Sequence, residues 1–388
     1  MRICFVSHSS ALGGAEKALI ELIIALKEKG IYCIVILPSH GPLCDEIKKL
    51  KIDYFIIKYW WWVARSLALW KRIARLILNF FSLFFIACRL KRYNIDFVCS
   101  NTLTISVGMF VAKLLRIPHI FFIHEFGKEG LGLQFDIGEN FSLDLMSKLS
   151  VGIICNSNAV AKKFSKYFSK DKLFVVYQSV TVNPFRHDLK VQNKINPELT
   201  IGQLNCVIVG TLQESKRQED AILAISELRK KGLNVILEIV GGGDIGYKSY
   251  LFNLVNENNL KNYVYFHDYV YPPFPIISRS DVLLMCSIYE AFGRVTVEGM
   301  LLGKPVIGAK SGGTLELIKD GFNGLLYTVG DYHELAKKIE YIYFHREEAL
   351  KMGENGFNWA SKLFTKDNYS ETFIKAINCL KLSKQLKS

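Results

Sequence analysis

Two glutamates flank a strand-to-helix junction in the second half of this 388-residue sequence. Glu290 and Glu298 bound the segment EAFGRVTVE, which follows the apolar run DVLLMCS and precedes the helical GMLLGKPV. In a parallel sheet such a loop lies at the carboxyl edge, where ligands of these sheets bind. Glu298, one turn into the predicted helix, could hold two ribose hydroxyls, because both oxygens of a carboxylate accept hydrogen bonds. Glu290 would face the cleft that is expected between the two halves of the chain.

Backbone N–H groups belong to the same junction. Those that would face a phosphate at the helix N-terminus come from Phe292, Gly293, Arg294 and Val295. A plainer explanation is that glutamates near a helix start are solvated or cap the helix. These residues alone leave both explanations open.

A glycine pair, Gly13 and Gly14, stands between a predicted strand and a predicted helix in the first half of the chain. The helix is predicted because apolar residues recur at helical spacing from Leu19 to Leu26, while Glu16 lies off that face. Without side chains, the glycines allow a ligand to approach the helix N-terminus. They are equally consistent with a tight turn.

Alternating strands and helices have to position these residues. Short β-branched or aromatic runs alternate with amphipathic stretches, which is the pattern of βαβ units with a parallel sheet. We predict strands at 3–7, 33–37, 54–57, 97–100, 120–124, 152–155 and 174–177, and then at 206–210, 235–240, 264–267, 282–286, 305–308 and 325–327. Both halves are thus predicted to be doubly wound α/β domains, 1–185 and 205–365. A linker is expected at 186–204, and a C-terminal helix at 366–388 is expected to return to the first domain.

The stretch from Trp60 to Arg92 is unusually rich in aromatic, leucine and basic residues. Its longest uncharged run, between Arg75 and Arg89, has 13 residues, fewer than the ~20 that a bilayer requires. We therefore expect the segment 60–92 to lie in the lipid headgroup region, where basic residues favour an anionic surface. The alternative is a helix buried in the core of the domain.

Composition sets broad limits. Half of the residues are apolar, and the formal net charge of +13 attracts polyanions without choosing among nucleic acid, lipid and diphosphate. The nine cysteines form no C-x-x-C pair, which favours buried, reduced thiols. The N-terminus lacks the pattern of a secretory signal, so a cytoplasmic location is expected. No D-x-D triplet and no metal-type His or Cys spacing occurs, and we predict no metal and no other cofactor.

The sequence resembles the retaining glycosyltransferases of the GT-B fold, in the large group called family 4. The resemblance rests on Glu290 and Glu298 with E-x-F-G between them, and on GKPVIGAKSGGTLELIKDGFNGLLYTVGD from Gly303 to Asp331. It extends to GGAE at 13–16, a histidine at a strand end, and NSNAVAKKF at 156–164. The order and spacing of these pieces are more specific than any one of them.

This resemblance implies roles for individual residues. Lys216 would contact the diphosphate, Glu290 the hydroxyls of the donor sugar, and Glu298 the ribose. His124 would face the reacting centre, although a strand-end histidine with a structural role is the alternative. Thr211 stands where the family often has an arginine, so that Arg217 or Arg294 would have to replace that cation. The predicted catalytic residues are His124, Lys216 and Glu290, and the predicted donor site is Gly14, Gly210, Arg217, Phe292, Gly293, Arg294, Val295, Glu298, Ser311 and Gly313.

The function implied is transfer of a sugar from a nucleotide diphosphate sugar to an acceptor, with retention of configuration. We expect a UDP-sugar, with GDP- or dTDP-sugars as alternatives, and a lipid-linked saccharide acceptor in cell-surface polysaccharide synthesis. The enzyme would be a metal-independent hexosyltransferase in the cytoplasm, bound peripherally to the anionic inner face of the cell membrane. No nucleic-acid partner is expected, because no recognition motif accompanies the charge.

Two other functions compete with this one. Gly241, Gly243 and Gly246 satisfy G-x-G-x-x-G after a predicted strand, with Asp268 near the end of the next one. This is the dinucleotide fingerprint, which would indicate an NAD-dependent oxidoreductase. The second alternative is a non-catalytic membrane-surface protein with the same fold, which Thr211 favours and which the presence of Lys216 disfavours.

Overall fold

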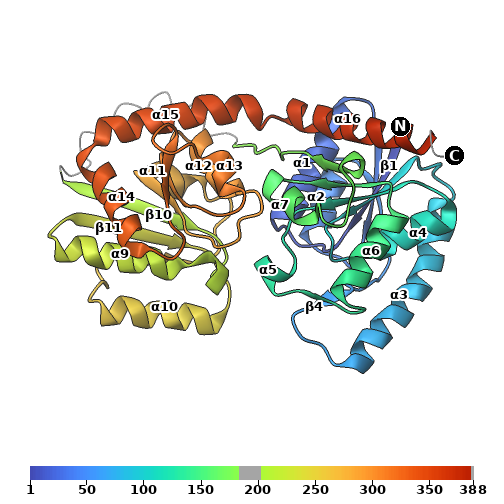
Figure 1. The fold of residues 1–388 in the computed structure, drawn as a ribbon, viewed down its shortest axis with the longest axis horizontal. Helices are drawn as coiled ribbons and strands as arrows, with labels where there is room; N and C mark the ends of the chain where they lie inside the picture. Colours follow the sequence, from blue (N-terminus) through green and yellow to red (C-terminus); the bar gives the residue numbers. More distant parts are fainter. Residues whose placement is uncertain (183–201, 386–388) are drawn as a thin grey trace. The chain divides into compact units, whose positions relative to one another are not determined.

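A computed structural model describes residues 1–182 and 202–385, and these form two compact units (Figure 1). Unit 1 consists of Met1–Ser179 with Thr365–Ser388, and unit 2 of Val180–Phe364. The predicted linker, 186–204, lies mostly outside the described residues, and its last two residues belong to the first strand of unit 2. Unit 1 ends at Ser179, before the predicted domain end at 185.

Unit 1 is built on a seven-stranded parallel sheet with the order β3-β2-β1-β5-β6-β8-β9. Its strands are β1 (Arg2–Ser7), β2 (Tyr32–Leu37), β3 (Asp53–Ile56), β5 (Phe97–Asn101), β6 (His119–Ile123), β8 (Gly152–Cys155) and β9 (Leu173–Val175). The order reverses at β1, where Ile3 is in register with Cys33 on one side and Phe97 on the other. Its strands are apolar and largely buried, as expected when helices cover both faces of a parallel sheet.

Helices pack on both faces of this sheet. They are α1 (Gly14–Glu28), α2 (Pro42–Lys49), α3 (Leu69–Leu90), α4 (Val107–Leu115), α5 (Lys128–Leu131), α6 (Glu139–Leu149), α7 (Asn158–Phe164), the 3-10 turn η1 (Lys170–Lys172) and α16 (Lys366–Gln385). The C-terminal helix α16 packs beside α1 (Figure 1). The ring of Phe373 lies 6.1 Å from that of Phe5 in β1. The last helix therefore completes the core of unit 1.

Unit 2 repeats the architecture with a six-stranded parallel sheet of order β12-β11-β10-β13-β14-β15. Its strands are β10 (Gln203–Val209), β11 (Asn234–Val240), β12 (Val264–His267), β13 (Val282–Met285), β14 (Val306–Ala309) and β15 (Gly324–Tyr327). Its helices are η2 (Glu214–Lys216), α9 (Gln218–Lys230), α10 (Ile245–Glu257), α11 (Phe274–Arg279), α12 (Arg294–Leu301), α13 (Thr314–Leu317), α14 (Tyr332–Phe344) and α15 (Arg346–Leu363). The order reverses at β10, between β11 and β13.

The predicted fold class, two doubly wound parallel α/β domains, is confirmed. Each predicted strand is present, with ends that differ by a few residues at most. The sequence pattern missed β4 (Val63–Ala64) and β7 (Gln134–Phe135), which pair antiparallel with each other. Two residues are too short to show any alternation of apolar and polar side chains.

Helix α3 occupies the aromatic and basic segment and is largely uncovered. Only Asn79, Ser82, Ile86, Ala87 and Leu90 are buried along its 22 residues, so it is not a core helix. In the described part of the chain it is the one helix whose length and composition would suffice to cross a membrane. In the first half of α3, Arg75 forms an ion pair with the buried side chain of Asp136 and donates to the Val63 carbonyl. That arginine therefore joins the helix to the β4–β7 pair.

The cysteines form no disulfide in residues 1–182 and 202–385. Seven of them are buried, and burial strongly raises the pKa of thiols such as Cys99 and Cys206. Cys88 and Cys379 are exposed, which corrects the expectation that all nine are buried. Both lie on the outer side of a helix, where the sequence context is apolar but the surroundings are open.

Candidate active site

Each sheet has a switch point, where the strand order reverses and ligands of such folds bind at the carboxyl ends. In unit 2 the switch point lies between β10 and β13. The segments that follow these two strands carry Gly210 to Lys216 and Glu290 to Glu298, and the loop after β14 carries Ser311 to Gly313. The structure thus brings most of the predicted donor site to one edge of one sheet.

Lys216 and Glu290 meet at this edge although 74 residues separate them. The Lys216 Nζ donates to Glu290 Oε2 at 2.7 Å, and both side chains are partly shielded from water. The backbone adds to the contact, because the Ile288 N–H donates to the Ser215 carbonyl at 2.9 Å. An ammonium has three donors, so Lys216 can keep Glu290 and still bind a phosphate oxygen.

The loop at 311–313 packs directly on the loop that carries Glu290. The Gly313 N–H donates to the Glu290 carbonyl at 2.7 Å, and Ser311 Oγ donates to the Ile288 carbonyl. Gly312 has a φ of 49°, and a Cβ there would lie 2.2 Å from the Glu290 oxygen. A side chain at 312 would therefore separate the two loops, which explains the glycine.

Helix α12 begins at the predicted junction. Its N-cap, Gly293, has a φ of 95°, a left-handed conformation that favours glycine, and no side chain caps the helix. Arg294 is the first helical residue, and Glu298 follows one turn later, half-buried. The ring of Phe292 packs edge-on against Phe364 at 5.5 Å, which holds the junction against the end of α15. An uncapped helix N-terminus is suited to an anion.

Arg217, one of the two candidates for the missing cation, is paired with acidic residues of its own unit. Its Nε and Nη2 donate to the two oxygens of Asp220, at 2.8 and 2.6 Å, and Glu219 lies 3.6 Å from Nη1. Asp220 is fully buried. The charge of Arg217 is therefore already balanced within the protein.

Two of the three glycines of the dinucleotide fingerprint, Gly241 and Gly243, are explained by packing. A Cβ on Gly241 would lie 2.0 Å from the Gly210 oxygen, and one on Gly243 would lie 2.3 Å from the Leu212 oxygen. The loop after β11 thus touches the backbone that leads to Lys216. Asp268 pairs instead with Lys248, at 2.8 Å. The close contact with 210–212 accounts for Gly241 and Gly243 without a bound dinucleotide.

In unit 1, His124 follows β6, and both of its ring nitrogens form hydrogen bonds. Its Nε2 lies 2.7 Å from Asn101 Oδ1, and its Nδ1 lies 2.7 Å from Gln178 Nε2. Asn156 donates to its carbonyl oxygen at 3.3 Å. An amide oxygen can only accept, so Asn101 Oδ1 takes a hydrogen bond from Nε2. Gly14 also belongs to unit 1, as the first residue of α1.

Glu125, next to His124, is a residue that the sequence analysis missed. Its carboxylate accepts the N–H of Leu103 at 2.8 Å and that of His124 at 3.0 Å. Burial raises the pKa of Glu125 to about 7, against the lowering effect of these two N–H groups, and Glu16 adds to the increase. A single carboxylate after a strand carries no sequence signal that would have indicated this.

A second missed cluster surrounds the end of β1. His8 Nδ1 lies 3.1 Å from Glu16 Oε1, and the ring of Trp61 lies 5.5 Å from that of His8. The Trp61 Nε1 donates to the His8 carbonyl at 2.7 Å. Glu16, predicted to lie off the buried face of α1, is only 2% exposed. Burial lowers the pKa of His8 to about 4 and raises that of Glu16.

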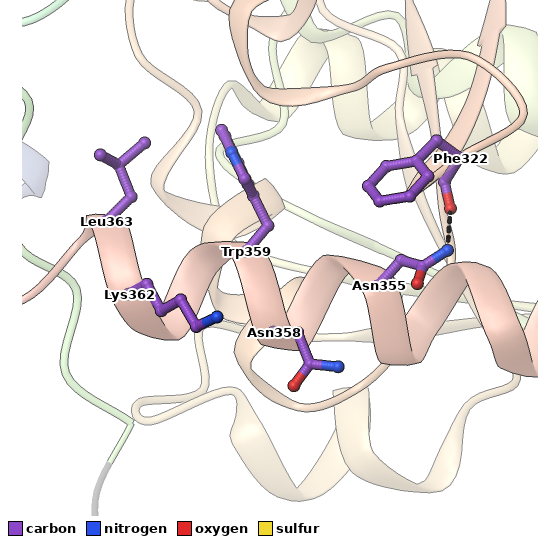
Figure 2. A pocket seen from close by; sticks show the side chains of 6 residues that line it. All are labelled: Phe322, Asn355, Asn358, Trp359, Lys362 and Leu363. Atoms are coloured by element: carbon purple, nitrogen blue, oxygen red, sulfur yellow. Dashed lines mark hydrogen bonds between the residues drawn. The ribbon is translucent and has the colours of Figure 1, made fainter.

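A separate pocket of about 400 Å³ lies on α15, as Figure 2 shows. It is an open, mostly apolar hollow between Phe322, Asn355 and Trp359, and the Asn355 side chain donates to the Phe322 carbonyl at 2.9 Å. None of the predicted site residues lines it. We place the candidate site at the switch point because the charged and backbone groups gather there.

Two family models match the chain. "Glycosyltransferase Family 4" matches residues 12–183, and "Glycosyl transferases group 1" matches residues 192–359. Among solved structures, Anabaena HepE in complex with UDP superposes with a TM-score of 0.80 at 22% identity, covering 97% of this chain and 100% of that one. The chain is therefore a glycosyltransferase of the GT-B fold.

Two curated relatives match a shorter part of the chain at higher identity. An uncharacterized glycosyltransferase of Methanocaldococcus jannaschii, MJ1607, is 29% identical over 58% of this chain. The chain spans 60% of the length of that relative. The capsular polysaccharide biosynthesis glycosyltransferase CapM of Staphylococcus aureus is 27% identical over 64% of this chain and 67% of its own.

Proposed function

We propose that this protein transfers a hexose from a UDP-sugar to a lipid-linked saccharide, with retention of configuration, during synthesis of a cell-surface polysaccharide. The reaction needs no metal ion and takes place on the cytoplasmic side of the cell membrane. The observation that carries the proposal is the Lys216–Glu290 pair, held beside the uncapped start of α12 at the switch point of unit 2.

Lys216 supports the assignment because of the chemistry of the leaving group. When the bond between the sugar and the diphosphate breaks, negative charge grows on the phosphate oxygen. A positioned ammonium and the N–H groups at the start of α12 can stabilise that charge without reorganising. Glu290 then accepts sugar hydroxyls on the same side, and Glu298 accepts the ribose hydroxyls one helical turn further.

The choice of UDP is supported by the relatives. HepE structures contain UDP and UDP-glucose, in a fold that this chain shares. The lipid-linked acceptor and the polysaccharide pathway are supported by relatives such as CapM, named for capsular polysaccharide biosynthesis. Retention of configuration rests on the resemblance to family 4.

The decisive experiment is a donor panel. Purified protein is incubated with UDP-, GDP- and dTDP-hexoses, and both the melting temperature and the hydrolysis of the donor are recorded. We expect a UDP-hexose to stabilise the protein and to be hydrolysed slowly, with product of the same anomeric configuration by NMR. If only a GDP- or dTDP-sugar stabilises the protein, that sugar nucleotide is the donor in place of a UDP-sugar. Binding of NAD without any response to sugar nucleotides would overturn the proposal in favour of an oxidoreductase.

A further inference from the structure

The middle of α3 buries polar side chains, whereas its C-terminal end buries Ile86, Ala87 and Leu90. Its buried polar side chains, Asn79 and Ser82, face the rest of unit 1. Asn79 accepts the Trp60 N–H at 2.8 Å and donates to the Trp60 carbonyl at 3.0 Å, and Ser82 donates to the Lys58 carbonyl at 2.6 Å. A surface helix usually turns its apolar side inward and its polar side outward.

From Leu69 to Phe85 the exposed side of α3 is apolar except for Lys71. Its large exposed side chains are Leu69, Trp70, Ile73, Leu76, Ile77, Leu78, Phe80, Phe81, Phe84 and Phe85, and we call them the α3 face. Trp70 is 68% exposed and Phe80 is 70% exposed. Such a continuous apolar patch on a folded domain marks a surface that meets a partner or a membrane.

Basic residues border the α3 face. No aspartate or glutamate occurs from residue 54 to residue 95, whereas Lys71, Arg89, Lys91 and Arg92 are exposed at the two ends of the helix. Residues 71 and 89 are 18 positions apart, which is five turns at 3.6 residues per turn. They therefore flank the apolar side along the same edge, one near each end.

We propose that the α3 face binds flat to an anionic lipid surface. Its aromatic and leucine side chains enter the boundary between headgroups and acyl chains, and Lys71 and Arg89 contact headgroup phosphates. This deepens the proposed function, since it brings the enzyme to the layer that carries a lipid-linked acceptor. The basic residues favour an anionic lipid surface over a second copy of this chain. A symmetric dimer through α3 would bring the basic residues of the two copies together, and like charges repel.

The contacts of α3 favour lying flat over spanning. At ~1.5 Å per residue, 22 residues reach about the thickness of a hydrocarbon core, so length alone permits both. However, the middle of the helix is bonded to unit 1 through Asn79 and Ser82, and α4 packs alongside. Spanning would carry the polar backbone of these contacts into lipid, where its hydrogen bonds could not be replaced by water.

The test measures binding of the full-length protein to vesicles by flotation. We expect binding to phosphatidylglycerol vesicles, weaker binding to phosphatidylcholine vesicles, and loss of binding at high salt. Trp70→Ser with Phe81→Ser and Phe84→Ser should reduce binding at least tenfold. The matched control is Leu114→Ser with Phe141→Ser, which removes exposed apolar side chains of unit 1 that lie outside α3. These control substitutions should leave vesicle binding unchanged.

A second variant tests whether the basic residues contribute to vesicle binding. Lys71→Ser with Arg89→Ser should weaken binding to anionic vesicles by about fivefold per charge. Arg75 must be kept, because its pairing with Asp136 supports the fold. Equal melting temperatures of all variants would show that the face is not part of the core.

Several outcomes overturn the inference. Wild-type protein that stays unbound to anionic vesicles contradicts it directly, and a dimer that the Trp70, Phe81 and Phe84 substitutions dissociate assigns the face to a second copy. Resistance of bound protein to salt and carbonate extraction indicates spanning instead of flat binding. Transfer to a soluble acceptor reports separately on the proposed function: vesicle binding without any transfer leaves this inference standing and removes the other.

Discussion

Lys216 illustrates how one contact unites two distant motifs. It lies after β10 and bonds to Glu290 after β13, and the switch point is the only reason that these segments are neighbours. In the proposed reaction this ammonium stabilises the leaving diphosphate, while Glu290 holds the sugar. The pair is partly shielded from water, which strengthens electrostatic interactions relative to bulk solvent.

Replacing Lys216 by alanine should lower kcat/KM for the donor about 10²- to 10³-fold, the scale for removing one transition-state donor. Steady-state kinetics with the best sugar nucleotide measures this. Lys231→Ala is the matched control, because Lys231 forms ion pairs with Glu227 and Glu340 away from the predicted site residues. Near-normal activity of the Lys216 variant would transfer the role to Arg217 or Arg294.

Glu298→Ala should act mainly on donor affinity. Its assigned contact is with the ribose, which is held both before and during the reaction, so the KM for the donor should rise more than kcat falls. Glu340→Ala, on the exposed side of α14, serves as the comparison. A donor KM equal to that of the wild type would remove Glu298 from the donor site.

The pH dependence of stability should report on Glu125. Burial raises its pKa to about 7 in the folded state from about 4.5, so the folded protein retains a proton that the unfolded chain loses. Stability from this residue is therefore lost as pH rises from about 4.5 to about 7. His8 has the opposite sign, because its lowered pKa of about 4 makes stability rise with pH up to about 6.5.

The experiment compares urea midpoints of wild type and Glu125→Gln from pH 4.5 to pH 8. The difference between the two curves removes the contribution of His8, which both proteins share. The advantage of wild type over the variant should shrink between pH 4.5 and pH 7. Parallel curves would mean that Glu125 titrates normally.

At the scale of elements, loops pack through glycines. The loop after β11 reaches the loop after β10 because Gly241 and Gly243 leave room for the backbone of Gly210 and Leu212. The same principle brings Gly312 onto Glu290. These contacts, more than any single side chain, hold the candidate site in place.

Gly243→Ala should destabilise unit 2 by about 1 to 3 kcal/mol, the usual cost of overpacking, because its Cβ would lie 2.3 Å from the Leu212 oxygen. Gly242→Ala is a matched control one residue away, since the nearest atom to its Cβ is 3.9 Å distant. Chemical denaturation of both variants tests this. Equal stabilities of the Gly243→Ala and Gly242→Ala variants would show that the loop rearranges at little cost. The packing explanation of Gly243 would then fail.

At the scale of the whole molecule, two doubly wound units share one chain and a net charge of +13. Basic residues border the α3 face in unit 1, and Lys216 and Arg294 belong to the candidate site in unit 2. An excess of positive charge favours association with anionic substrates and surfaces. Both the proposed donor and the proposed lipid surface are negatively charged.

Activity should survive EDTA and should not rise severalfold with Mg²⁺ or Mn²⁺. The physical reason is that Lys216 and the N–H groups at the start of α12 are assigned to the diphosphate, which in metal-dependent transferases is held through a divalent ion. Donor turnover is measured after dialysis against chelator, with and without added ion. Strict dependence on a divalent ion would contradict the mechanism proposed for Lys216.

Local patterns in the sequence were sufficient to predict the order and the type of the elements. Alternating apolar runs and helical periodicity are local properties, which is why the strands and the helix after Gly13 could be predicted from neighbouring residues. The motif around Glu290 could be placed at a sheet edge for the same reason. Local pattern likewise showed that the segment 60–92 was too apolar for an ordinary surface.

Which distant residues meet could be seen only in the folded protein. It paired Arg217 with buried Asp220, enclosed His124 between Asn101 and Gln178, and buried Glu16 beside His8. It also turned Asn79 inward, so that the aromatic side of α3 faces outward. Hydrogen-bond partners and burial depend on contacts between segments far apart in the chain, and no local periodicity encodes those contacts.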